Sequence, residues 1–205
     1  MNNDNKKKRL ILIDCGHGNV YCGNYQTPGK RSPVWADGSQ LFEGELNRAV
    51  GLRLTEYLVK WDIPYAFIMD WNSDTTLRSR KVRANKYAKA YNCFLLSIHS
   101  NAGGGKGFEA FTWPGTTDSD FFADIIYEEF IKEFPDVRLR SDWSDGDYDK
   151  EERFYILGSK PPAVLVEAFF MDNEEEYRKY LSTSQGRDRI ARAYAMAIKE
   201  IYQRL

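Results

Sequence analysis

The sequence is poor in histidine and cysteine, with two and three of them in 205 residues. The cysteines Cys15, Cys22 and Cys93 are odd in number and lack the C-x-x-C spacing of a metal site, so we expect free thiols of a chain made in a reducing compartment. No run approaches the roughly 20 apolar residues that span a bilayer, and we expect no stable membrane association. The apolar stretch from Leu10 to Ile13 is too short for a signal-peptide core, which predicts cytoplasmic synthesis.

Charge of one sign is not in excess, because 29 Lys and Arg stand against 30 Asp and Glu. This balance argues against bulk binding of nucleic acid through its phosphates, and it leaves a local basic patch open. A chain of 205 residues, of which 42% are hydrophobic, fits one domain with a core of its own. We expect a flexible tail over residues 1–8, a catalytic domain over residues 9–205, and a monomer.

Apolar runs typical of strands alternate with segments of helical periodicity. The expected strands are 9–14, 64–69, 93–98, 108–113 and 163–170, and the expected helices are 43–61, 75–91, 118–133 and 185–204. Two segments between them, 15–42 and 135–152, are predicted to be loops. This alternation predicts a single α/β domain with a central, twisted, mostly parallel (mixed) sheet that is flanked by helices on both faces.

Both histidines follow predicted strands and stand close to glycines. His17 lies in "DCGHG" after the first strand, and His99 lies in "LLSIHSNAGGG" at the end of the third. Ligands of open α/β sheets bind beyond the carboxyl ends of the strands, so the two imidazoles are expected to meet at one edge of the sheet. The alternative, that each imidazole only forms hydrogen bonds within its own loop, stays open at this point.

Two carboxylates add to this pattern. Glu43 opens a predicted helix, where an acid ordinarily serves the helix dipole. Glu167 interrupts the apolar strand "AVLVEAFF", and a carboxylate in such a place must be paired, metal-bound or protonated. Two histidines and one carboxylate are a ligand set of catalytic zinc sites, which keep one position open for water. A further carboxylate can then take the proton of that water.

Five stretches of the chain resemble, in order, the motifs of zinc-dependent N-acetylmuramoyl-L-alanine amidases of the amidase-3 type. They are "ILIDCGHG", "EGELNRAV", "RSRKVRAN", "LLSIHSNA" and "PAVLVEAFFMDN", and the resemblance extends from about residue 9 to 202. Enzymes of this family cut the amide between the lactyl group of N-acetylmuramic acid and the first L-alanine of the peptidoglycan stem peptide. The resemblance implies that one Zn²⁺ ion is held by His17, Glu43 and His99. It also implies that Glu167 is the catalytic base and later protonates the leaving amine.

The motifs settle some details and depart from the family in others. The family pattern has an asparagine four residues after the ligand glutamate, so Asn47 selects Glu43 rather than Glu45. Cys15 stands where the family usually has proline. A thiol nucleophile at Cys15, close to His17 in the sequence, is the disfavoured alternative.

Three further residues are candidates for supporting roles. Asp14 is expected to orient His17 through the second ring nitrogen, or else to cap the end of its strand. Asn101 is expected to bind the substrate amide, or else to form a turn. Arg80 matches a family motif and is expected to tie its helix to neighbouring loops.

The stretch "RFYILGSKPPAVLVEAFF" looks most like amidases of phage endolysins. That resemblance implies an enzyme that waits in the cytoplasm until a holin opens the membrane and then acts on the cell wall. A bacterial enzyme, a zinc peptidase that cuts elsewhere in the stem peptide, and a non-catalytic wall-binding module with structural zinc are the alternatives. Glu167 speaks against the last of these, because a closed structural site needs no second acid in its wall.

Overall fold

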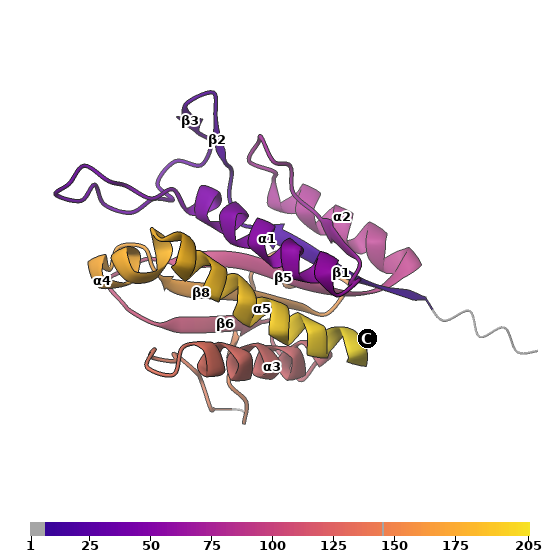
Figure 1. Ribbon diagram of the computed structural model, residues 1–205. Coiled ribbons are helices and arrows are strands. Elements are labelled where there is room, and N and C mark those ends of the chain that lie inside the picture. The colour runs from indigo at the N-terminus through magenta and orange to yellow at the C-terminus, as the bar shows by residue number, and fades with distance from the viewer. Residues whose placement is uncertain (1–6, 145) are drawn as a thin grey trace, which may run out of the picture.

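A six-stranded mixed sheet forms the centre of the protein in the computed structural model, which describes residues 7–144 and 146–205 (Figure 1). The strand order is β4-β1-β5-β8-β6-β7. The strands are β1 (Lys8–Cys15), β4 (Tyr65–Phe67), β5 (Tyr91–Asn101), β6 (Phe108–Thr112), β7 (Lys150–Glu151) and β8 (Ala163–Phe170). The first four in this order are parallel, and β6 runs antiparallel to β8. The predicted mostly parallel α/β sheet is confirmed.

Helices cover both faces of the sheet, as expected. The helices α1 (Glu43–Lys60), α3 (Asp118–Glu133) and α5 (Ser184–Arg204) pack together over one face, where they bury strand residues such as Ile11, Phe94 and Val164 (Figure 1). The helix α2 (Leu77–Ala90) lies on the other face and contributes Ala84 to a second apolar cluster. Since successive strand residues point to opposite faces, Leu12 belongs to this second cluster while Ile11 belongs to the first.

Several elements differ from the sequence-based expectation. The segment predicted as a loop after His17 contains a small hairpin of β2 (Val20–Tyr21) and β3 (Asn24–Tyr25), and the acidic loop contains β7. A short helix α4 (Glu174–Glu176) and a π-helical turn η1 (Tyr177–Leu181) precede α5. The strand β1 already includes Lys8, and the rest of the predicted tail lies largely outside the described residues. Among the helices of residues 7–144 and 146–205, none is long and apolar enough to cross a membrane.

Three parallel strands carry polar side chains on the face of the sheet that α2 covers. Along each of them, the side chains that point to this face change from apolar to polar toward the carboxyl end. The three rows are Leu10–Leu12–Asp14, Cys93–Leu95–Ser97–His99 and Ala163–Leu165–Glu167. The same sheet face is therefore core at one end and a cleft at the other.

Candidate active site

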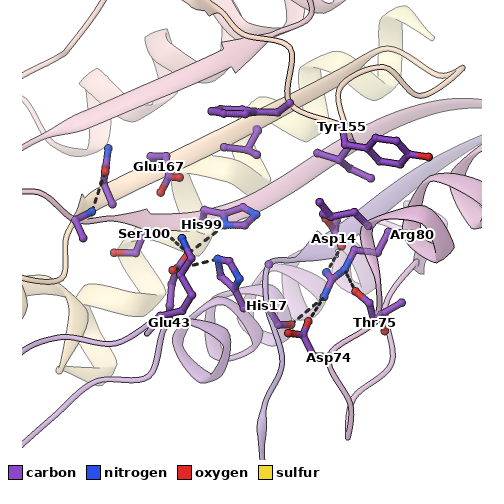
Figure 2. A pocket seen from close by; sticks show the side chains of 18 of the residues that line it. Asp14, His17, Glu43, Asp74, Thr75, Arg80, His99, Ser100, Tyr155 and Glu167 are labelled. Carbon is purple, nitrogen blue, oxygen red and sulfur yellow. Dashed lines mark hydrogen bonds and ion pairs between the residues drawn. The ribbon is translucent and has the colours of Figure 1, made fainter. Parts of the chain in front are cut away.

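His17, Glu43 and His99 meet at the carboxyl edge of the sheet (Figure 2). The Nε2 atom of His17 lies 3.2 Å from Oε2 of Glu43, and Nδ1 of His99 lies 3.1 Å from Oε1 of the same carboxylate. One nitrogen or oxygen from each residue lies within 4.8 Å of the others. Ligand atoms about 2.0–2.1 Å from a tetrahedral zinc ion are roughly 3.3 Å apart, so the donor set and its spacing suit such an ion. The three residues that were predicted from the sequence as ligands are brought together.

Glycines allow the three elements to approach so closely. A Cβ atom on Gly16 would lie 2.1 Å from Cε1 of His99, and one on Gly44 would lie 1.7 Å from the carbonyl oxygen of Gly18. Only residues without a side chain fit at these contacts. At the start of α1, Glu43 is buried while Glu45 is exposed, in agreement with the choice of Glu43.

The charges within this cluster stabilise one another. Burial alone would raise the pKa of Glu43, but hydrogen bonds from His17 and His99 outweigh it and hold that pKa well below its usual range. Burial alone would lower the pKa of His99, yet the bond to Glu43 and the nearby carboxylates raise it. The ionised carboxylate thus lies between the two imidazole rings, where a bound cation would be coordinated by all three side chains.

Glu167 lies directly opposite His99 in the pairing of β8 with β5. Its Oε2 atom is buried and has no hydrogen-bond partner within residues 7–144 and 146–205. Burial raises the pKa of Glu167 to about 8, and the negative charges of Glu43 and Glu109 add to this effect. A buried carboxyl oxygen without a partner, next to a possible metal site, is the arrangement expected of a group that exchanges protons with a ligand.

A cleft of about 640 Å³ surrounds these residues and reaches from Glu167 to Tyr155 (Figure 2). Leu77 and the neighbouring Phe154 and Tyr155 form an exposed apolar part of its wall. Lys30 contributes a positive charge from the segment before α1. This size is in the usual range for pockets that hold small organic ligands.

Asp14 has a different role from the one expected. Its two carboxylate oxygens accept hydrogen bonds from Arg80 and from Ser97 Oγ rather than from the His17 ring. Because Arg80 also donates to the His17 carbonyl oxygen, Asp14 supports His17 through the backbone.

Asn101 lines the cleft, but its polar atoms are used within the protein. Its Nδ2 donates to Glu109, and its Oδ1 accepts from the backbone N–H of Ala102. Glu109 also binds Arg140 and Lys150, and it lies opposite Glu167 in the sheet. Glu109 was not predicted from the sequence, although it interrupts the strand "FEAFTW" in the same way as Glu167 interrupts "AVLVEAFF".

Cys15 is not suited to be a nucleophile. Its thiol is fully buried, and burial raises its pKa to about 12. Since the thiolate is the reactive form, this cysteine is inert near neutral pH. All three cysteines are free, as expected.

The fold and the site together define an α/β enzyme with a His–Glu–His centre at the carboxyl edge of its sheet. The sequence pattern of the Amidase_3 family, described as N-acetylmuramoyl-L-alanine amidase, matches residues 11–200. The chain belongs to this family of peptidoglycan-cleaving amidases.

Two curated relatives and several solved structures are similar to the chain. The N-acetylmuramoyl-L-alanine amidase CwlM of Bacillus licheniformis is 31% identical over 196 residues, which are 94% of this chain and 68% of the relative. A sporulation-specific amidase of Bacillus subtilis (strain 168) is 29% identical over the same shares. The crystal structure of an amidase from Clostridium difficile 630 has a TM-score of 0.76 at 22% identity, with 97% of this chain and 98% of that chain covered. The catalytic domain of the CD27L endolysin has a TM-score of 0.65 at 24% identity, with 95% and 97% covered.

Proposed function

We propose that the protein is a zinc-dependent N-acetylmuramoyl-L-alanine amidase whose catalytic domain spans residues 9–205. In this proposal, His17, Glu43 and His99 hold one zinc ion and Glu167 is the catalytic base. The proposal depends above all on one observation, the 3.1 and 3.2 Å spacing of three suitable donors beside an unpartnered buried carboxyl oxygen. We propose a monomer as the active unit, since no second subunit is needed to bring these four residues together.

Zinc bound at this site would polarise the scissile carbonyl group and make water acidic enough to attack it near neutral pH. The chain supplies the proton transfers. Glu167 accepts a proton from the attacking water while the water oxygen bonds to the lactyl carbonyl carbon. It then returns that proton to the nitrogen of L-alanine as the carbon–nitrogen bond breaks. The products are the muramic acid carboxylate and a stem peptide with a free amino terminus.

The environment of Glu167 suits both halves of this exchange. An acid whose pKa is about 8 readily donates a proton near neutral pH, as the leaving amine requires. A cation in the neighbouring His–Glu–His cluster would favour the ionised form of Glu167 and so prepare it to accept a proton. The two roles are separated in time, since the second follows bond formation.

The test is mass spectrometry of soluble products from purified peptidoglycan, after treatment with zinc-loaded protein and with chelator-treated protein. Stem peptides that begin with a free L-alanine amino group, present only in the zinc-loaded sample, are the expected result. Fragments cut within the stem would assign the protein to the zinc peptidases instead. Intact peptidoglycan beside zinc-loaded protein would refute the proposed activity.

For the biological setting we propose a phage or prophage endolysin, on the resemblance of residues 153–170 to such amidases. The names of the two Bacillus relatives favour a bacterial cell-wall amidase as the second candidate. Expression in a bacterial host with and without a holin separates the two. Lysis that requires both genes supports the endolysin, and a wall-associated activity that needs no holin supports the bacterial enzyme.

A further inference from the structure

The backbone of His17 has an unusual conformation. Its φ angle is 63°, in the left-handed region that residues with a side chain rarely adopt. Such a conformation persists only where the surrounding structure holds it in place. At His17 the holding contacts are on its carbonyl oxygen, which accepts hydrogen bonds from Arg48 at 3.0 Å and from Arg80 at 2.9 Å.

Arg80 reaches this carbonyl oxygen from α2 and is buried (Figure 2). Its Nε donates to the Thr75 carbonyl oxygen at 2.8 Å, and one terminal nitrogen donates to the carbonyl oxygen of Cys15 at 2.7 Å. The same nitrogen forms an ion pair with Asp14. The guanidinium group therefore binds the backbone at the end of β1 through the carbonyl oxygens of Cys15 and His17, and Asp14 fixes its orientation.

Arg48 makes the second contact from α1. One of its terminal nitrogens donates both to the His17 carbonyl oxygen and to that of Gly44 at 2.9 Å. Gly44 is the neighbour of Glu43 at the start of the same helix. One nitrogen thus links the backbones that carry two of the three metal-binding side chains.

Electrostatics alone would not place these two groups here. Two guanidinium groups beside a cation site repel the cation, and only Arg80 has a buried carboxylate partner in Asp14. A planar guanidinium, however, can donate to several carbonyl oxygens in fixed directions, which an ammonium group cannot do. The contacts therefore indicate that the two arginines position the backbone, and that this effect outweighs their repulsion of the cation.

We propose that Arg48 and Arg80 are positioning residues of the metal centre. They hold His17 in its left-handed conformation and so aim its imidazole at Glu43 and His99. This inference rests on the proposed zinc site. It adds two residues from two helices that act through the backbone of His17 and not as ligands.

The test is the zinc dissociation constant of Arg48→Lys and Arg80→Lys, measured by competition with a chromophoric chelator. Both variants keep the positive charge but lose the planar set of N–H donors of the guanidinium group. Groups that orient a metal ligand typically contribute about 10–100-fold to affinity, and we expect each variant to bind zinc more weakly by that factor. Arg53→Lys is the matched control, since Arg53 lies on the same helix and donates to the carbonyl oxygen four residues before it, as Arg48 does.

The Co²⁺-substituted proteins provide a second readout. The visible absorption spectrum of cobalt reports the arrangement of its ligands, so it should change in the two variants and remain unchanged in Arg53→Lys. Unchanged zinc affinity and an unchanged spectrum in Arg48→Lys and Arg80→Lys would overturn the inference. Tighter zinc binding would also overturn it, because relief of repulsion would then be the main effect. If Arg80→Lys does not fold, Arg48→Lys decides the question.

The same measurements distinguish a failure of the proposed metal site from a failure of the proposed role of the arginines. Parent protein that binds no zinc refutes the metal site itself. Equal zinc affinity of the parent protein and the two variants refutes only the role of the arginines. Thermal unfolding of the chelated proteins shows whether a variant has lost its fold rather than its metal geometry.

Discussion

Replacement of Glu167 by glutamine removes the proposed base and keeps the size of the side chain. A positioned general base contributes about 10²–10⁴-fold to the rate. We therefore expect kcat to fall by that factor, which corresponds to roughly 3–5 kcal/mol in the barrier. Zinc binding should persist, because Glu167 is not one of the three proposed ligands, whose side chains meet in the structure.

The same substitution should change how stability depends on pH in the metal-free protein. The pKa of Glu167 is raised from 4.5 to about 8 by burial. Between these values the native state keeps a proton that the unfolded chain releases, so the stability contributed by this group is full below pH 4.5 and is lost as the pH rises through 8. At 1.36 kcal/mol per unit, the loss is at most about 5 kcal/mol. Glutamine carries no such proton and should show no such loss.

Two assays check the two parts of this prediction. Release of amino groups from peptidoglycan gives kcat for zinc-loaded parent and Glu167→Gln protein. Urea unfolding of the chelated proteins at about pH 5 and about pH 9 gives the free energy of unfolding, and Glu167→Gln should become the more stable of the two at the higher pH. Parental kcat at full zinc occupancy would refute the base assignment. A stability difference that does not vary with pH would refute the raised pKa.

Three other experiments test the proposed metal centre. His99→Ala removes a proposed ligand and should weaken zinc binding by more than the roughly 100-fold that outer groups contribute, as chelator competition would show. Full zinc occupancy would contradict the assignment. Gly16→Ala places a methyl group 2.1 Å from the ring of His99, so we expect reduced zinc affinity and a lower melting temperature. If zinc affinity and melting temperature both equal those of the parent protein, the backbone moves to accept the methyl group without loss of stability. Glu43→Gln should lose zinc, while Glu45→Gln, at an exposed position on the same helix turn, should retain it. Elemental analysis of the purified proteins measures the zinc content of each variant. Equal zinc contents would refute the choice of Glu43.

Much of the fold could be predicted because its local signals agree with its tertiary structure. The helix predicted over 118–133 and the strand predicted over 163–170 have the same bounds in the structure. The helix begins after Thr117, whose side chain and that of Asp120 form a capping box. The strand β8 is an apolar run, interrupted at Glu167, that lies between β5 and β6 in the interior of the mixed sheet.

The parts that were missed depend on contacts between distant segments. The strand β7 has two residues and exists only because it pairs with β6 at the edge of the sheet. The partner of Asp14 could not be inferred, because Arg80 lies 66 positions away on a helix whose sequence gives no sign of a buried cation. Glu109 was within reach of sequence analysis, since a carboxylate inside an apolar strand needs a partner wherever it occurs.

The centre is built where the backbone departs from regular structure, and this explains its precision. Besides His17, Phe169 has a positive φ of 64°, at a bulge where β8 gains one residue relative to β5. The bulge keeps Glu167 opposite His99 but places Phe170 opposite Asn101. The strained peptide around Phe169 is held by its N–H bond to the Gly107 carbonyl oxygen and by the bond from Ser100 Oγ to its own carbonyl oxygen. Protein contacts therefore hold the backbone in a left-handed conformation at His17 and at Phe169, one in the proposed metal site and one two residues after Glu167.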